Sequence, residues 1–364
     1  MPAFDLVALG CGGGPSEHNL SSYIFKLSDV AWKDGAVALE AGSGLGALSS
    51  LLRLQPNLFD SRPRQSGCPD SGSPNYSAAE VYSWIRCFLI THSHLDHVNG
   101  LILSAGSLGG PRRQVYGAQH TLEDLSTIFS GRIWPKLASW DEGDPLPLLL
   151  SALSANGHYR SIAPDISVRM MPISHGQPEG LGTYECAAFF VRHDRNLREF
   201  LFFGDVEPDT ISANPRNKYV WREAAPKIPD TLSAIFIECS YPSGRRDDLL
   251  YGHLSPEHLL AELTCLAVEV INGRTQAYRG QALPAGSSSP ARKKQRRDTA
   301  PPPPSPRGAL EGLRVYIIHC KDDIHGIYDR PIHHVVADEV RTLVDARGLG
   351  ATIIAVDQGM QIAI

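Results

Sequence analysis

The feature that most constrains this chain is a dense run of potential metal ligands, THSHLDH, at residues 91–97. It follows an apolar run at 87–90 that predicts a buried strand, so the ligands belong to the loop at the strand's end. Three imidazoles and a carboxylate this close together would be costly to bury without partners. Imidazole nitrogen and carboxylate oxygen are good ligands for zinc and similar divalent ions. The run therefore predicts a metal site.

The spacing within the run predicts ligands for two ions. His92 and His94 are two residues apart, so on an extended segment their side chains point to the same side. Asp96 and His97 follow where the chain turns into a helix expected at 98–104, and they can face a second point nearby. Two-metal sites hold their ions about 3.5–4 Å apart, which one loop can serve.

Four later polar residues each end an apolar, strand-like run. They are His175, Asp205, Glu238 and His319. One polar residue at a strand end usually marks only the start of a loop. Four of them, together with the histidine run, favour a shared site at one edge of a sheet. Glu238 is expected to lie behind the metal ligands as support.

Composition limits the classes of function that remain. The chain has 42% hydrophobic and 20% charged residues, as globular proteins do. The basic run 292–298 carries a local charge of +4 within a net charge of −5, so the rest carries −9, which disfavours a grip on long nucleic acid. Seven cysteines without a CxxC pair favour a reduced, intracellular compartment. No apolar run approaches bilayer-spanning length, and no signal peptide is expected.

The pattern of apolar residues predicts a layered α/β or α+β fold in one domain, residues 1–364. Strands are expected at 4–9, 22–26, 36–40, 86–90, 114–116, 167–171, 186–192, 200–203, 233–238, 314–318, 351–356 and 360–364, and helices at 45–52, 98–104, 121–130, 209–223, 256–272 and 335–347. Residues 56–78 are expected to form a loop insertion. The Ser-, Pro- and charge-rich segment 275–312 is expected to be a disordered insertion.

Several runs together resemble a known family. These are LGCGGGPSEHNLSSY near the start, HxHxDH, PISHG, FGD, IECS, GHLSPEH and the late IIHCK. The combination resembles the metallo-β-lactamase superfamily and, within it, the class II cyclic-nucleotide phosphodiesterases of the fungal low-affinity cAMP type. The resemblance implies an αββα sandwich, in which two packed mixed sheets carry helices on their outer faces.

The resemblance also implies a ligand set and a reaction. One ion would be held by His92, His94 and His175, the other by Asp96, His97 and His319, and Asp205 would bridge the two. A metal-bridged hydroxide would attack the cyclic phosphate of 3′,5′-cyclic AMP and leave the 5′-nucleotide. Asp96 and Asp205 would thus be catalytic as well as metal-binding. Zinc is favoured by ligand type, with manganese or iron as alternatives.

Three more positions are considered because of the family resemblance. His253 corresponds to a non-ligand histidine of related phosphodiesterases and is expected to act as general acid or phosphate binder. Its alternative reading is a loop histidine before a helix capped by Ser255, with Pro256 in the first turn. Lys321 is a candidate phosphate ligand. Glu40 stands where members usually have aspartate behind the metal ligands.

Other readings stay open at this stage. Cyclic GMP is a second possible substrate, RNA 3′-end processing is an alternative activity of the same fold, and a catalytically silent metal-binding partner is a third reading. The chain is expected in the cytoplasm, with nuclear import through the basic run 293–297 as an alternative. A homodimer is the default expectation for the fold. The glycine-rich loop 10–14 is expected as a tight turn, and His325, His333 and His334 as surface residues or supports of the ligands.

Overall fold

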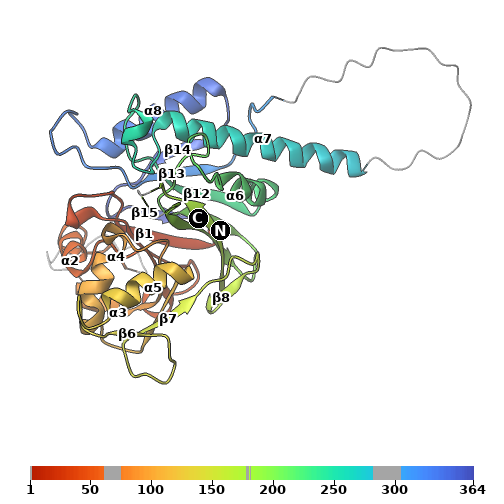
Figure 1. Ribbon diagram of the computed structural model, residues 1–364. Helices are drawn as coiled ribbons and strands as arrows, with labels where there is room; N and C mark the ends of the chain where they lie inside the picture. Colours follow the sequence, from red (N-terminus) through yellow and green to blue (C-terminus); the bar gives the residue numbers. More distant parts are fainter. Residues whose placement is uncertain (1, 61–74, 178–179, 181, 282–304) are drawn as a thin grey trace, which may run out of the picture.

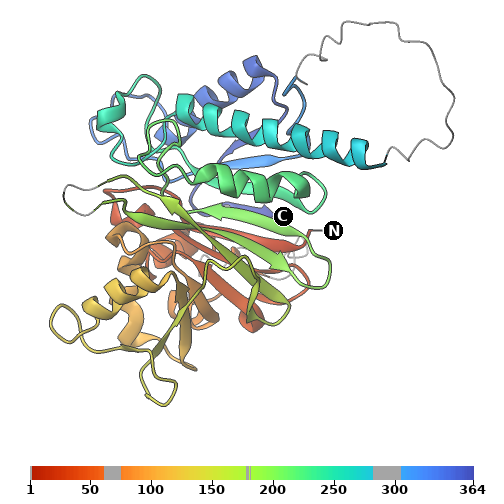
Figure 2. The same cartoon turned by 45° about the vertical axis from the view of Figure 1, so that its right-hand side comes forward.

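Two mixed β-sheets pack face to face, and helices cover the outer face of each sheet (Figure 1, Figure 2). The computed structural model describes residues 2–60, 75–177, 180, 182–281 and 305–364. The four layers confirm the predicted αββα sandwich.

The first sheet has eight strands in the order β15-β1-β2-β3-β4-β5-β7-β6. Neighbours from β15 to β3 are antiparallel, and neighbours from β3 to β6 are parallel. The strands are β1 (Phe4–Gly10), β2 (Ser22–Leu27), β3 (Ala36–Leu39), β4 (Ile85–Leu89), β5 (Arg113–Gly117), β6 (Ala138–Ser139), β7 (Leu148–Ala152) and β15 (Gln361–Ala363).

The second sheet has seven strands in the order β14-β13-β12-β11-β10-β9-β8. Neighbours from β8 to β11 are antiparallel, and neighbours from β11 to β14 are parallel. The strands are β8 (Arg160–Ala163), β9 (Ile166–Ser174), β10 (Glu185–His193), β11 (Glu199–Phe203), β12 (Leu232–Glu238), β13 (Arg314–Ile318) and β14 (Thr352–Ala355).

The helices divide between the two outer faces. Apolar residues of α2, α3, α4 and α5 pack on the first sheet, and those of α6, α7 and α8 pack on the second. The helices are α1 (Trp32–Gly35), α2 (Leu45–Leu54), α3 (Ala78–Ser83), α4 (Leu95–Ser104), α5 (Gln119–Ile128), α6 (Asn217–Ala224), α7 (Pro256–Gln281) and α8 (Ile332–Arg347). Within the described part of the chain, no helix has the length and apolar character needed to cross a membrane.

The layer between the sheets is rich in aromatic side chains. Phe236 stacks on Tyr316 with ring centroids 4.6 Å apart, and Phe202 lies 6.1 Å from Phe236. Tyr23 of the first sheet meets Phe202 edge to face at 5.3 Å. Such pairs bury large apolar surfaces and lock the two sheets in one relative position.

The strand directions of the second sheet gather polar residues at one edge. β9, β11, β12 and β13 run the same way, because β9 and β11 are both antiparallel to β10 and the others are parallel to β11. Their carboxyl ends therefore meet at one edge of the sheet. His175, Asp205 and His319 come just after three of these strands, and Glu238 ends the fourth.

One predicted helix is wrong over half its length. The helix expected at 209–223 begins only at Asn217, and residues before it form turns. The Asp209 carboxylate accepts hydrogen bonds from the backbone N–H groups of Asn217 and Lys218, both at 2.9 Å. Pro215 also disfavours helical geometry in the residue before it. Both features explain why α6 begins later along the chain than the spacing of apolar residues predicted.

The predicted disordered insertion is shorter than expected. Helix α7 continues to Gln281, and Ala309 and Leu310 are buried, so the disordered segment predicted at 275–312 is wrong at both ends. Phe59 packs edge to face on Trp32 at 5.2 Å, so the loop predicted at 56–78 has an ordered beginning. The middle parts of these predictions, 61–74 and 282–304, lie outside the described residues.

Helix α3 and strands β6, β7 and β8 were not predicted. Ser77 and Glu80 form a capping box at the start of α3, a signal that the polar composition of the preceding loop obscured. The apolar run at 148–150 indicates β7 in retrospect. β8 is short and half-exposed, so its sequence carries little apolar pattern.

Replacing Phe236 with alanine is expected to lower the free energy of unfolding by about 3–5 kcal/mol, because it opens a cavity between the sheets. Chemical denaturation followed by circular dichroism measures the change. Val268→Ala on the exposed side of α7, where Val268 is 44% exposed, is the matched control and should have little effect. Equal stability of the two variants would contradict the described core.

Candidate metal centre

The loop after β4 places four candidate ligands on two sides. His94 has extended backbone dihedral angles and occupies the position just before α4, so Asp96 and His97 lie in the first helical turn. The backbone N–H of His97 donates to the carbonyl of His94 at 2.9 Å. The change from strand-like to helical backbone lets Asp96 and His97 face a second group, although the His97 ring still lies 4.1 Å from that of His92 between centroids.

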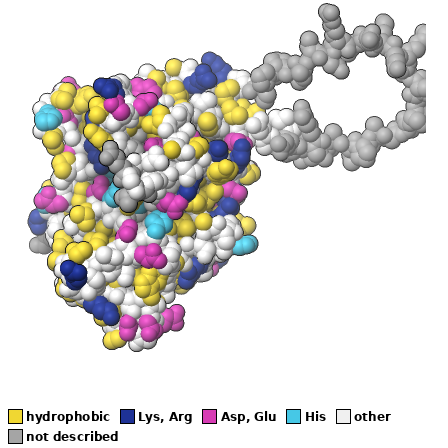
Figure 3. All heavy atoms as spheres, viewed as in Figure 1, with side chains coloured by type: hydrophobic (Ala, Val, Ile, Leu, Met, Phe, Trp, Pro, Cys, Tyr) yellow, Lys and Arg dark blue, Asp and Glu magenta, His cyan; other side chains and the backbone are white. Residues whose placement is uncertain are grey.

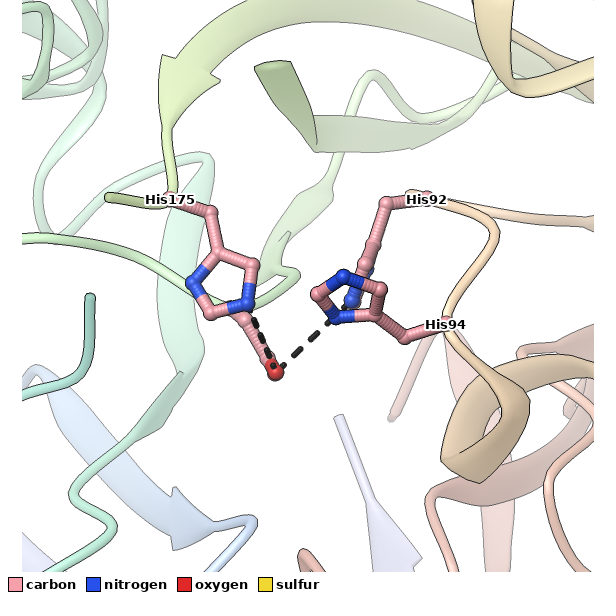
Figure 4. A group of neighbouring side chains, drawn as sticks. His92, His94 and His175 are labelled. Atoms are coloured by element: carbon pink, nitrogen blue, oxygen red, sulfur yellow. Dashed lines mark ion pairs between the residues drawn. The ribbon is translucent and has the colours of Figure 1, made fainter. Parts of the chain in front are cut away.

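A first group of ligand atoms gathers around one oxygen of Asp205. His92, His94, His175 and Asp205 each offer an atom within 4.8 Å of the others. The Nε2 atoms of His92 and His175 lie 3.7 and 3.6 Å from Asp205 Oδ2. Figure 4 shows the three labelled rings converging from two separate segments of the chain. The group matches the first predicted set.

A second group gathers around the other oxygen of the same carboxylate. The Nε2 atoms of His97 and His319 each lie 3.3 Å from Asp205 Oδ1. Asp96 Oδ2 is 3.3 Å from the same nitrogen of His319, and the four residues meet the same 4.8 Å criterion. Asp205 thus belongs to both groups, and the structure brings together all seven predicted ligands.

Hydrogen bonds on the far side of the rings orient the ligand nitrogens. The Nδ1 atoms of His92, His175 and His319 lie 3.0, 2.9 and 3.3 Å from Thr91 Oγ1, Gly252 O and Ser240 Oγ. Such contacts fix the ring and leave Nε2 for a metal.

Two observations test whether divalent ions fit these groups. The buried Nε2 of His92 has no hydrogen-bond partner among the described residues. The Nε2 atoms of His97 and His319 approach each other to 3.0 Å beside two carboxylates. Buried polar atoms require partners, and convergent imidazole nitrogens next to carboxylates are the donor set of zinc and related ions. The residues therefore fit divalent metal.

The charge states suit the same role. Burial lowers the pKa of His175 to about 3 and that of His92 well below its usual value, so both rings are neutral and keep a free lone pair. Burial alone would raise the pKa of Asp205, but the neighbouring His319 and His97 outweigh it and hold that pKa well below its ordinary value. The carboxylate is therefore ionised.

His253 lies beside both groups and is held by Glu238. Its ring centroid is 4.8 Å from that of His175 and 5.3 Å from that of His319. His253 Nδ1 lies 2.8 Å from Glu238 Oε1, an oxygen that also accepts from the backbone N–H of Val206. Burial lowers the pKa of His253 to about 4 and raises that of Glu238 to about 7. The sequence pattern predicts Glu238 only as a support behind the metal ligands, without this contact to His253.

Lys321 reaches the same edge from the segment after His319. Its Nζ donates to the carbonyl of Gly13 at 2.7 Å and lies 3.5 Å from Asp96 Oδ2. A side chain at Gly13 would meet the His319 ring at 2.7 Å. The glycine-rich loop therefore allows the backbone to pass directly behind a candidate ligand. The predicted tight turn is wrong, because residues 11–21 form a longer connection between β1 and β2 in which Gly12 pairs with Leu20 and Cys320.

Glu40 supports the second group from behind. Its carboxylate lies 3.6 Å from His97 Nδ1 and accepts from the backbone N–H of Thr91 at 3.3 Å. Burial raises its pKa. Glu40 and His319 both have left-handed backbone angles, with φ of 57° and 59°. Non-glycine residues rarely adopt this conformation, and such strain concentrates at functional sites.

Tyr184 also belongs to the site and was not predicted; its ring stacks on that of His94 with centroids 4.6 Å apart. It follows a loop without a recognisable motif, so no sequence signal marked it. His333 and His334 instead form a separate surface group, in which both Nε2 atoms lie within 2.9 Å of Asp357 Oδ1. His325 is exposed.

The fold and the histidine–aspartate groups define a protein of the metallo-β-lactamase type with a site suited to divalent metal. A solved structure titled as unliganded yeast PDE1 aligns over 100% of both chains with a TM-score of 0.76 and 23% identity. The metallo-β-lactamase fold protein YhfI from Bacillus subtilis aligns over 100% of this chain and 99% of its own, with a TM-score of 0.53 and 13% identity. Both likenesses establish the fold.

The chain belongs to the class-II cAMP phosphodiesterase family, whose profile matches residues 9–359. It is similar to a 3′,5′-cyclic-nucleotide phosphodiesterase of Schizosaccharomyces pombe, with 33% identity over 72% of this chain and 75% of that protein. A 3′,5′-cyclic-nucleotide phosphodiesterase of Aliivibrio fischeri is 30% identical over 75% of this chain and 77% of its own. The chain is therefore an enzyme of the cyclic-nucleotide phosphodiesterase class.

Replacing Asp205 with asparagine is expected to weaken zinc binding by more than about 100-fold, since even residues behind metal ligands contribute 10–100-fold. Equilibrium dialysis with metal analysis measures the bound zinc. Asp357→Asn, which changes a carboxylate beside two surface histidines, is the matched control and should leave the high-affinity zinc in place. The same zinc content in both variants would contradict the site.

Proposed function

We propose that this enzyme hydrolyses 3′,5′-cyclic AMP to 5′-AMP at a two-metal site and so ends a cyclic-AMP signal. The observation that carries the proposal is the position of Asp205, whose two oxygens face two separate groups of histidines. A carboxylate shared in this way suits a pair of ions that act on one phosphoryl group. Family membership supplies the cyclic-nucleotide substrate class.

Each proposed ion has its own ligand set. Asp205 would serve both ions, and the remaining ligands would divide into His92, His94 and His175 for one ion and Asp96, His97 and His319 for the other. When bound, two divalent ions supply a water-derived nucleophile at neutral pH and neutralise charge on the phosphoryl oxygens. Zinc is the ion that this ligand set favours, with manganese or iron as alternatives.

The chain's own residues would manage the leaving group. As the bond between phosphorus and the ribose 3′ oxygen breaks, that oxygen must gain a proton. We assign this proton to Nε2–H of the neutral His253 ring, and Glu238, whose pKa is raised to about 7 so that it can hold a proton, would return one to Nδ1. Glu238 would set the ring's orientation.

Lys321 is the proposed ligand of a free phosphate oxygen. Its side chain is 27% exposed, and its ammonium lies between the backbone carbonyl of Gly13 and the carboxylate of Asp96. The contact with Asp96 keeps the positively charged ammonium of Lys321 next to the proposed ion-binding site. An ammonium group binds phosphate oxygens as a point charge.

The other readings of the sequence receive less support. Membership in the phosphodiesterase family favours a cyclic nucleotide over an RNA 3′ end. The convergence of all seven candidate ligands favours catalysis over a silent binding role. Cyclic GMP stays a second candidate substrate, because no described contact selects adenine.

Zinc-loaded protein is expected to convert cyclic AMP to 5′-AMP, and Asp205→Ala is expected to lower kcat by about a thousandfold, because the ions contribute several kcal/mol. Chromatographic separation of the products measures both. Asp357→Ala should retain wild-type activity. Absence of turnover by wild-type protein with two ions bound per chain would reject cyclic AMP as substrate.

Replacing His253 with glutamine tests its role as proton donor. The variant is expected to lose about 100-fold or more in kcat on cyclic AMP. It should lose far less on a p-nitrophenyl phosphodiester, whose leaving group departs without a proton. Equal losses on both substrates would assign His253 to phosphate binding instead.

A further inference from the structure

The loop between β12 and α7 carries an exposed layer of aromatic and cationic side chains. The Arg245 guanidinium carbon lies 3.8 Å from the ring centroid of Tyr241 and 6.0 Å from that of Tyr251. Tyr251 is 66% exposed, so its ring faces solvent as well as Arg245. The positive charge of Arg245 therefore lies next to both tyrosine rings.

This loop is held in place by bonds to the helices behind it. The backbone N–H of Ser243 donates to Glu339 of α8 at 2.9 Å, and that of Gly244 donates to Glu257 of α7 at 3.2 Å. Arg245 itself donates from Nε to the carbonyl of Leu249 at 2.7 Å. The loop is therefore anchored to both helices and the Arg245 side chain has a backbone partner before any ligand binds, which lowers the entropic cost of binding.

Both tyrosines are direct chain neighbours of residues that contact the metal centre. Tyr241 follows Ser240, whose hydroxyl bonds to Glu238 and lies 3.3 Å from His319 Nδ1. Tyr251 precedes Gly252, whose carbonyl lies 2.9 Å from His175 Nδ1.

The layer therefore stands at the rim of the site. Tyr241 is also 6.0 Å from the His253 ring between centroids, so a row of rings leads outward from the site. Figure 3 shows histidine and acidic side chains reaching the surface close together where the upper and lower halves of the molecule meet.

The backbone of Tyr251 is in an unusual conformation. Its φ is 52°, in the left-handed region that bulky side chains rarely adopt. Because the Tyr251 ring is two-thirds exposed, its burial contributes little free energy to offset this backbone strain. Strained, exposed residues beside a reactive centre are typical of ligand contacts.

We propose that Tyr241, Arg245 and Tyr251 form the subsite for the planar base of the cyclic nucleotide. The inference rests on the proposed function and adds where the base binds. The base would stack on the exposed ring of Tyr251 and on the plane of the Arg245 guanidinium. The phosphate would then occupy the metal centre beside His253. A stacking contact does not select one base over another, because every base has a π-face. The subsite therefore predicts similar binding of cyclic AMP and cyclic GMP.

The test compares Tyr251→Ala, Tyr251→Phe and Arg245→Met with wild type on two substrates. One is cyclic AMP, and the other is ribose 3′,5′-cyclic phosphate, which lacks a base. Loss of stacking should raise KM for cyclic AMP about 10-fold in the alanine and methionine variants while kcat changes little. The base-free substrate should be unaffected, and Tyr251→Phe should behave as wild type because it keeps the ring.

Tyr219→Ala, which removes a 50% exposed tyrosine from α6 beside Lys218, is the matched control and should change neither KM. Equal KM values for cyclic AMP in wild type, Tyr251→Ala and Arg245→Met would overturn the subsite, as would an equal rise in KM for the base-free substrate. Thermal unfolding of each variant identifies any that fail to fold.

Calorimetric binding of 5′-AMP to the same proteins separates this inference from the proposed function. Wild-type protein that binds 5′-AMP but does not turn over cyclic AMP would reject the function alone. Equal affinity of wild type, Tyr251→Ala and Arg245→Met for 5′-AMP would reject the subsite alone.

Discussion

The carboxylate of Asp205 is the group on which the rest of this site depends. It is 2% exposed, and it stays ionised only because neutral and charged histidines surround it on both sides. A buried negative charge without such partners would be strongly unfavourable. Its two oxygens point toward different histidine groups, so one short side chain sets the distance between them. The contacts of His92, His175 and His319 on their far sides keep the rings directed at this carboxylate.

The fold explains how residues so far apart in sequence reach Asp205. Three strands of the second sheet deliver His175, Asp205 and His319 at their carboxyl ends, and this works only because β9, β11 and β13 run in the same direction. The loop after β4 adds its ligands from the opposite sheet. Glu238, at the end of β12, falls between these strands and holds His253 where the two groups meet.

Local patterns in the sequence predicted a layered α/β or α+β fold and a shared site for the candidate ligands, and the family resemblance added the αββα sandwich and the division of those ligands into two sets. His92, His94, Asp96 and His97 are neighbours in sequence, and an apolar run before a polar residue marks each later ligand. Features that arise from distant contacts left no such pattern. Asp209 delays the start of α6 through bonds across a turn, and Tyr184 meets His94 only after β10 is in place. The left-handed backbone of Glu40 is likewise set by its surroundings.

The division of the ligands between two sheets has a thermodynamic consequence. His92, His94, Asp96 and His97 come from the first sheet's side of the sandwich, whereas His175, Asp205 and His319 come from the second. An ion bound by both sets would hold the two halves together, and its binding energy would then be linked to the free energy of their association. Metal supply would then regulate the amount of folded protein as well as the rate at which each molecule works. A cell short of metal would lose this enzyme through turnover of loosened chains, in addition to losing its catalysis.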